Sequence, residues 1–116
     1  MKSIGNSDLT WREFLRVEMR VGTILSAEIF KEAKKPAYKI QVDFGEFGIR
    51  KTSAQITKLY NTEEIIGRQV VAVINFPKKQ IANIMSECLI LGGLGSENDV
   101  VLLTTERTIK NGTRIG

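Results

Sequence analysis

The chain has 116 residues, of which 42% are hydrophobic and 26% are charged, and its formal net charge is +4. These values predict one globular domain over residues 1–116 with a core of its own, and they argue against disorder. The chain contains no histidine and a single cysteine, Cys88. That composition excludes an internal disulfide, histidine-based catalysis and the usual zinc sites.

Two further features bear on where the protein works. No run of about 18 apolar residues occurs, and residues 1–14 lack the apolar segment of a signal peptide. A lone cysteine is typical of a reducing compartment. We therefore expect a cytoplasmic protein without membrane insertion.

The positive charge is unevenly distributed along the chain. Residues 31–60 contain seven Lys and Arg residues against three acidic ones, whereas residues 83–106 contain four acidic residues and no base. A polarised, mildly basic domain suits a polyanionic partner such as nucleic acid. The alternative is a solvated surface with a chance excess of positive charge.

The first predicted elements are a short helix and a long strand. Thr10 and Glu13 have capping-box spacing, which predicts a helix from about Trp11 to Arg16. From Val17 to Ile29 the pattern changes to a period of two, which predicts a half-buried strand with a bend at Gly22. The apolar face of this strand is expected to carry Val17, Met19, Val21, Thr23, Leu25, Ala27 and Ile29.

A hairpin and a helical segment are expected next. Residues 38–44 alternate between apolar and polar side chains, residues 45–48 form a glycine-rich turn, and residues 49–52 form the returning strand. Ser53 is expected to cap a short helix whose apolar stripe is Ile56, Leu59 and Tyr60. A second helical turn over residues 62–66 would end at Gly67.

The remaining pattern completes an all-β order. The pattern predicts buried strands over residues 69–74 and 88–91 and a loop over residues 92–95. It also predicts a further strand over residues 100–104 and a type I′ turn at Asn111-Gly112. A helix between the third and fourth strands is the order of the five-stranded OB-fold barrel. The barrel would occupy residues 16–92 approximately. The N-terminal helix and the C-terminal strand extension would then help to form a dimer, because a free apolar edge must be covered.

The sequence resembles the tRNA-binding OB domains that are appended to some aminoacyl-tRNA synthetases and also occur as free proteins in bacteria and archaea. Within that family it is most similar to free homodimers described as protein-export chaperones. One departure from the tRNA-binding relatives is Glu87-Cys88-Leu89 after Ser86, where Gln-Gly-Met is usual. The stretches that carry the resemblance are VEMRVGTI (17–24), EAKKPA (32–37), VDFG (42–45), TSAQIT (52–57), VINFP (73–77), MSECLILG (85–92) and NGTRIG (111–116).

This resemblance implies a five-stranded OB barrel, a twofold dimer, and binding of tRNA or of unfolded and precursor polypeptides. Export machinery would be a further partner of such a chaperone. An acidic residue at position 87, close to a phosphate path, would weaken tRNA binding. None of these activities follows from composition or periodicity alone.

Candidate nucleic-acid contacts lie on the two loops that rim the ligand face of an OB barrel and around the predicted short helix. Adjacent lysines there can meet successive phosphates, or they can simply keep a loop soluble. Ser53 could offer its hydroxyl to an anion, or it could be only an N-cap. The candidates are Lys34, Lys35, Arg50, Lys51, Ser53, Gln55, Lys58, Asn75, Lys78, Lys79 and Ser86.

Other residues suit polypeptide binding or dimerisation. Phe76 offers an apolar surface on which a base or a peptide side chain could pack, or it belongs to the core. Cys88 is expected to be a buried small hydrophobe. The peptide-binding candidates are Phe76, Pro77, Lys78 and Lys79, and the dimer candidates are Trp11, Phe14, Leu15, Val100, Leu102 and Ile115.

Three classes of function remain to be compared. An enzyme is the weakest, since no paired acid and base, metal set or phosphate loop is evident, so we expect no catalytic residues and no cofactor. A polypeptide-binding export chaperone is the leading hypothesis, and a tRNA-binding protein that reads shape and backbone is the alternative. RNA binding would depend steeply on salt, whereas binding of apolar polypeptide would not.

Overall fold

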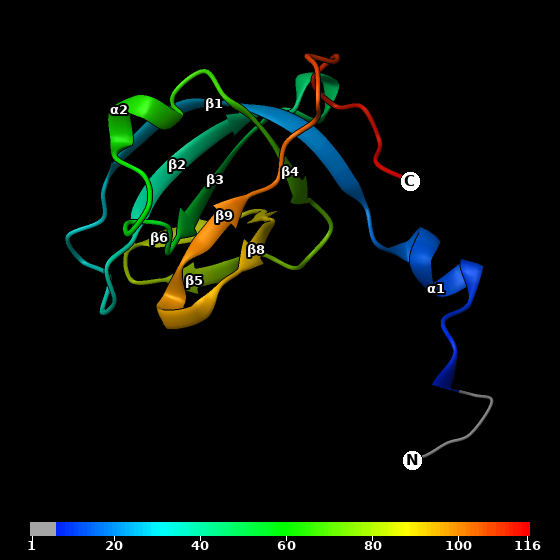
Figure 1. Ribbon diagram of the computed structural model, residues 1–116, viewed down its shortest axis with the longest axis horizontal. Coiled ribbons are helices and arrows are strands. Elements are labelled where there is room, and N and C mark those ends of the chain that lie inside the picture. The colour runs from blue at the N-terminus through cyan, green and yellow to red at the C-terminus, as the bar shows by residue number, and fades with distance from the viewer. Residues whose placement is uncertain (1–6) are drawn as a thin grey trace.

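The computed structural model describes residues 7–116, and Figure 1 shows a nearly closed β-barrel with α1 lying apart from it. A five-stranded sheet with the order β3-β2-β1-β4-β7 forms the wall, and two hairpins, β5-β6 and β8-β9, add to it. The OB-fold class predicted from the sequence is confirmed. The strands are β1 (Met19–Ile29), β2 (Tyr38–Asp43), β3 (Ile49–Ala54), β4 (Gln69–Val73), β5 (Lys79–Ile81), β6 (Ile84–Ser86), β7 (Leu89–Ile90), β8 (Gly92–Leu94) and β9 (Val100–Leu102).

Four short helices complete the element order in the described chain. They are α1 (Trp11–Arg16), α2 (Thr62–Ile65) and the 3₁₀ turns η2 (Gly45–Phe47) and η3 (Ser96–Asn98). Thr10 caps α1 through the predicted capping box with Glu13. None of the helices formed by residues 7–116 has the length and apolar character needed to cross a membrane.

Strand β1 belongs to both halves of the barrel. Its first part pairs with β4 and its last part with β2, and the register shifts between Ile24 and Ser26. This bulge inserts Leu25 and reverses which residues face inward beyond it. Ile24 is therefore buried, while Leu25 and Ile29 are exposed. The prediction that Leu25 lies on the apolar face is wrong for this reason. Ile29 lies opposite the buried Tyr38 and is exposed as the last residue of the strand.

The core fills the barrel with the alternating residues of β2 and the apolar run of β4. Ile40, Val42 and Phe44 are almost fully buried, as their alternation predicts. Gly22 lies against them, since a Cβ built on it would be 2.5 Å from Val42 Cγ1 and 2.8 Å from the Phe44 ring. The bend predicted at Gly22 is thus a close approach of backbone to core.

Adding a methyl group at Gly22 should destabilise the barrel. We expect Gly22→Ala to lower the free energy of unfolding by about 1–3 kcal/mol, because a packed core accommodates extra volume poorly. Urea denaturation monitored by circular dichroism measures the change. Gly93→Ala is the matched control, since its nearest neighbour would be 3.8 Å away. Equal midpoints for the two variants would contradict the prediction.

The helix predicted after Ser53 is absent, and Ser53 lies within β3. Strand β3 continues to Ala54 because its ladder with β2 does so, with Ser53 opposite Lys39 and Ala54 opposite Tyr38. Tertiary bonds hold the following turn instead, since Tyr38 Oη donates to the Tyr60 carbonyl at 2.7 Å. The second helical turn is confirmed as α2, which Asn61 caps and which ends just before Gly67.

The second half of the chain differs from the prediction in two places. Residues 79–86 form the hairpin β5-β6, which the sequence analysis did not predict. Residues 92–94, predicted as loop, form β8 and pair with β9. The predicted strand over residues 88–91 is confirmed but shorter, as β7.

The C-terminal segment adds a further edge to β1. Gly112 N–H donates to the Val21 carbonyl at 2.7 Å, Val21 N–H donates to the Thr113 carbonyl at 3.0 Å, and Ile115 N–H donates to the Met19 carbonyl at 2.9 Å. Of the two turn residues only Gly112 has a positive φ, at 93°. A type I′ turn requires positive φ at both, so the predicted turn type is wrong and the geometry is that of type II.

Candidate nucleic-acid interface

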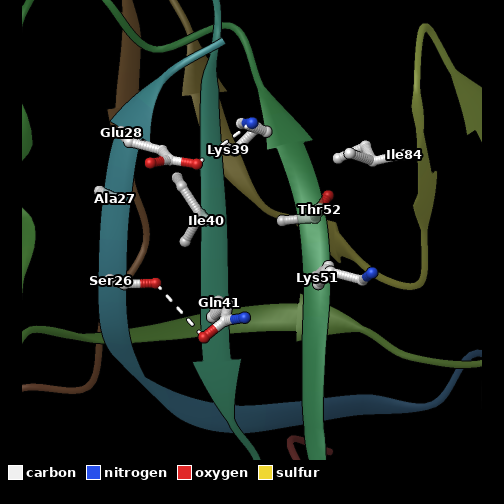
Figure 2. Close-up of a pocket in the computed structure, with 9 residues that line it drawn as sticks. All are labelled: Ser26, Ala27, Glu28, Lys39, Ile40, Gln41, Lys51, Thr52 and Ile84. Atoms are coloured by element: carbon white, nitrogen blue, oxygen red, sulfur yellow. Dashed lines mark hydrogen bonds and ion pairs between the residues drawn. The ribbon is translucent and has the colours of Figure 1, made fainter.

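The outward face of β1, β2 and β3 carries a grid of polar side chains that follows from strand register. Glu28 lies opposite Lys39 on the neighbouring strand. Ser26 lies opposite Gln41, and Gln41 lies opposite Lys51. Because residues two apart on a strand share a face, these side chains emerge on one side of the sheet. Figure 2 shows them lining a cavity of about 300 Å³.

Internal contacts orient the polar groups of this cavity. Lys39 Nζ is 3.2 Å from Glu28 Oε1 and 5.5 Å from the centroid of the Phe30 ring. Ser26 Oγ donates to Gln41 Oε1 at 3.4 Å. Figure 2 shows the Gln41 nitrogen turned toward Lys51. The cavity therefore presents cationic and neutral donors together with one carboxylate.

Two basic loops lie beside this face. Lys34 and Lys35 are exposed on the loop between β1 and β2, whose ends are joined by a bond from Phe30 N–H to the Ala37 carbonyl at 3.0 Å. Lys78 and Lys79 are exposed on the segment that leads from β4 into the β5-β6 hairpin. The same hairpin supplies Ile84 to the wall of the cavity. The two predicted rim loops are thus present, with lysines on both.

Glu87 helps to close the barrel rather than facing the cavity. Its backbone N–H donates to the Lys51 carbonyl at 2.8 Å, and its carboxylate accepts the Lys51 N–H at 2.9 Å. The pKa of Glu87 is lowered, mainly by that backbone bond, while Lys78 Nζ lies 3.5 Å from Oε2. The Glu87 carboxylate thus accepts the hydrogen bond that a carbonyl of a neighbouring strand would otherwise accept from Lys51 N–H. This explains an acidic residue at this position.

Acid should selectively remove the contribution of Glu87 to stability. A carboxyl whose native pKa lies below the ordinary 4.5 stabilises the fold above that pH, and loses this effect as the pH falls through the native pKa. We expect Glu87→Gln to be less stable than the wild type near pH 7 and the difference to shrink toward about pH 3. Urea midpoints across this range measure it. Glu46→Gln, an exposed site on η2, is the control, and a pH-independent difference would contradict the prediction.

Several predicted contacts are held by the chain itself. Arg50 Nη1 donates to the Ile74 carbonyl at 2.8 Å. Asn75 donates to the Arg16 carbonyl at 2.6 Å and accepts from Glu18 N–H at 3.0 Å. Ser86 Oγ lies 3.0 Å from Thr52 Oγ1. These contacts fasten strands and loops, so the geometry gives these side chains structural roles.

A separate hollow contains the other predicted residues near the β8-β9 hairpin. Ser53 and Gln55 line a cavity of about 420 Å³ that reaches Leu94 and Asp99. Lys58 Nζ donates to the Glu97 carbonyl and lies 3.9 Å from Asp99. Of the predicted nucleic-acid residues, Lys51 lines the first cavity. Ser53 shares its face by register, opposite Lys39, but lines this neighbouring hollow, and Gln55 and Lys58 lie outside the grid.

The residues that the sequence analysis missed are those on the strands. Lys39 and Gln41 alternate with the buried residues of β2, so their outward direction was readable from the period of two. Ser26 and Glu28 also fall on the polar face of the predicted strand, but the bulge at Leu25 changes the phase, so that Gly22 does not share their face. Ile84 belongs to the hairpin that was not predicted.

An apolar cleft lies between the segment that leads from β4 into β5 and the residues from the end of β6 to the start of β7. Its volume is about 520 Å³, and all four predicted peptide-binding residues line it together with Ser86, Cys88 and Leu89. Phe76 is 58% exposed, whereas Cys88 is buried. Burial raises the pKa of the Cys88 thiol to about 12, so the thiol is protonated at neutral pH. The cleft offers an aromatic wall, a proline and two flanking lysines.

The sequence of the chain matches a known family. Residues 19–114 match the family model described as "Putative tRNA binding domain". The chain belongs to this tRNA-binding domain family. It is 33% identical over 107 residues to the methionine–tRNA ligase of Methanococcoides burtonii, and 37% identical over 109 residues to methionine–tRNA ligase 1 of Bacillus anthracis. These matches cover 92% and 93% of this chain but only 16% of each ligase.

Solved structures of similar length fit the whole domain. The crystal structure of the chaperone CsaA from Bacillus anthracis has a TM-score of 0.90 and 49% identity, over 94% of this chain and 99% of that one. The CsaA chaperone protein from Picrophilus torridus gives 0.87 and 43%, over 94% and 100%. The MetRS related protein from Pyrococcus horikoshii gives 0.84 and 26%, over 94% and 98%. The resemblance predicted from the sequence is confirmed, and the tRNA-binding domain is CsaA-like.

Proposed function

We propose that this CsaA-like domain binds structured RNA such as tRNA, with the cavity on β1, β2 and β3 and the two lysine loops as its contact surface. The observation that carries the proposal is the grid in which Lys39, Gln41 and Lys51 offer donors on one face. Lys34 and Lys35 extend that face along the β1-β2 loop. Backbone phosphates would meet the lysines, and base or ribose groups would meet the amide.

Folded RNA suits this surface better than an extended single strand. General single-strand binders stack successive bases on exposed aromatic rings. Here Phe30, directly after β1, and Tyr38, at the start of β2, are only 3% and 8% exposed. The surface therefore offers charge and hydrogen bonds rather than a stacking platform, which is typical of recognition by shape and backbone.

The test is a fluorescence titration of bulk tRNA against the purified protein at low and at near-physiological salt. Micromolar binding with a steep salt dependence is the expected result, because phosphate contacts release counterions. If tRNA no longer binds at near-physiological salt, the basic surface attracts polyanions only weakly and without specificity, and the proposal is overturned.

A second candidate function is binding of unfolded or precursor polypeptides, as in a protein-export chaperone. The specific observation in its favour is the 520 Å³ apolar cleft with exposed Phe76, beside Pro77 and flanked by Lys78 and Lys79. Extended apolar peptide could pack against the aromatic wall, while the lysines favour acidic or neutral flanks. The similar structures described as chaperones are the CsaA proteins of Bacillus anthracis and Picrophilus torridus, and we extend polypeptide binding and the export role to this chain as a proposal.

Homodimerisation is part of the proposal, together with a cytoplasmic location and the absence of enzymatic activity. On α1, Trp11 is 81% exposed and Leu15 is 60% exposed, which suits a covered surface better than a solvated one. On β9 the predicted Val100 and Leu102 pack against the chain's own core, so the outward Val101 is the better interface residue. Phe14 and Ile115 are half-buried within the chain.

Substitution of Trp11 tests the dimer. We expect Trp11→Glu to shift the protein from dimer to monomer, because a charge would replace the largest exposed apolar surface of α1. Analytical ultracentrifugation at micromolar concentration gives the mass. Ile66→Glu, at a residue 48% exposed beside α2, is the control and should stay dimeric. A monomeric wild type would contradict the proposal directly.

A further inference from the structure

One acidic side chain lies in the middle of the basic face. Glu28 is the register partner of Lys39, and its Oε1 is 3.2 Å from Lys39 Nζ. The Glu28 side chain is 70% exposed and that of Lys39 is 28% exposed. A carboxylate at this position repels phosphate, so it opposes non-specific RNA binding. Its presence beside an ordered lysine therefore suggests a role in discrimination rather than in affinity.

The pair presents a fixed order of hydrogen-bonding groups. Figure 2 shows Glu28 and Lys39 at one end of the cavity, Ser26 and Gln41 at the other, and Ile84 at the side. Lys39 donates, and among residues 7–116 it is the only ion-pair partner of the Glu28 carboxylate, so lone pairs of that carboxylate stay available. Lys39 Nζ also lies 5.5 Å from the centroid of the Phe30 ring, in a cation–π contact. The cavity therefore offers a cationic donor directly beside a two-oxygen acceptor.

This order is complementary to one nucleobase. The Watson–Crick edge of guanine carries the O6 acceptor next to the N1–H and N2–H₂ donors. On the same edge, adenine, cytosine and uracil each carry only one donor group, so each can give the carboxylate one hydrogen bond at most. Only guanine carries an acceptor next to two adjacent donors, which matches a lysine beside a carboxylate that accepts two hydrogen bonds, and such charge-assisted, bidentate contacts are the strong ones.

We propose that Glu28 and Lys39 select a single unpaired guanine, with Lys39 Nζ donating to O6 and the Glu28 carboxylate accepting from N1–H and N2–H₂. The half-buried Ile84 packs against the flat face of the base, and the Gln41 amide lies toward its ribose. The cavity volume of about 300 Å³ is at the lower end of the range for small-ligand sites, as one nucleotide requires. This inference rests on the proposed RNA binding and adds its base specificity.

Short RNAs test the proposal in the full chain. The probes are fluorescently labelled UUUUUU, UUGUUU, UUAUUU and UUCUUU, with bulk tRNA alongside, measured by anisotropy at low and near-physiological salt. We expect UUGUUU to bind about tenfold more tightly than the other hexamers, which is the discrimination typical of one bidentate contact. Replacing the guanosine with inosine removes N2–H₂ and should lose part of that preference.

Glu28→Gln gives the decisive comparison because its two effects have opposite directions. The amide keeps the size of the side chain but puts a donor against N1–H or N2–H₂, so the preference for UUGUUU should fall to about twofold or less. Removing the negative charge should leave UUUUUU binding unchanged or slightly tighter. Glu63→Gln on α2 removes the same charge outside the cavity and should keep the full guanine preference.

The outcomes separate this inference from the proposed function. Binding of tRNA without any guanine preference overturns the guanine site and leaves RNA binding intact. An equal gain in affinity for all four hexamers in Glu28→Gln also overturns it, because Glu28 would then act only as a repelling charge. Failure of tRNA and of every hexamer to bind overturns both proposals. Loss of the preference in Glu28→Gln, but not in Glu63→Gln, supports the site.

Discussion

Reversing the two charges of the β1-β2 loop should weaken tRNA binding by about 100-fold at near-physiological salt. In the double variant Lys34→Glu with Lys35→Glu, two exposed cations beside the cavity become anions. Each lost phosphate contact should cost roughly tenfold and flatten the salt dependence, lowering the slope of log K against log salt by about 1.5–2 for the pair. Fluorescence titration at several salt concentrations measures both quantities.

The control must change the net charge by the same amount. Arg107→Glu with Lys110→Glu does so at exposed sites of the C-terminal segment, away from the cavity. If this control loses only a little affinity for tRNA and keeps the wild-type slope of log K against log salt, then the position of the charges and not the net charge determines tRNA binding. Equal losses in the two double variants would contradict a defined RNA surface.

Phe76→Asp should remove binding of unfolded polypeptide while leaving tRNA binding within about twofold of the wild type. Covering a phenylalanine side chain contributes about 1.5–3 kcal/mol, so its loss alone weakens binding by about 10-fold to 100-fold. The new carboxylate would also have to be desolvated in an apolar cleft, which increases the loss. A reduced and carboxymethylated client protein, titrated at two salt concentrations, provides the measurement.

The matched control for Phe76 is Leu94→Asp. Leu94 is 86% exposed on β8 and lies outside the cleft, so its substitution should leave polypeptide binding unchanged. If polypeptide binding by the wild type depends only weakly on salt, the result would agree with burial of apolar surface in the cleft. If tRNA binding falls as far as client binding in Phe76→Asp, the cleft and the polar cavity are not separate surfaces.

The sequence was informative about the fold wherever one local rule decided the structure. The alternation of residues 38–44 predicted β2 and its buried face, and the spacing of Thr10 and Glu13 predicted α1. It failed where tertiary pairing overrode local preference. Ser53 has the residue type of an N-cap, but its ladder with Lys39 keeps it in a strand. The bulge at Leu25 interrupts the alternation at Ile24-Leu25, but two adjacent apolar residues do not by themselves reveal a change of register.

The candidate site was predicted in part for the same reason. The lysines and Pro36 were enough to predict the rim loops from the sequence. The sequence also indicated that residues 76–79 form one exposed segment next to a buried strand. The central grid could not be predicted, because it depends on which residues of three strands lie opposite one another. The structural roles of Arg50 and Asn75 depend on backbone carbonyls about 24 and 59 residues away.

The bonds of the C-terminal segment also bear on the order in which the chain can fold. Val21 N–H is satisfied by Thr113, and Arg114 Nη2 donates to the Leu15 carbonyl across 99 residues of sequence. During synthesis the first strand of the barrel therefore emerges long before its final edge partner. Non-local pairing of this kind slows folding and leaves a strand edge open in the nascent chain. A protein that we propose to bind unfolded polypeptides thus has, in its own first strand, a segment that awaits its partner until residues 110–115 have left the ribosome.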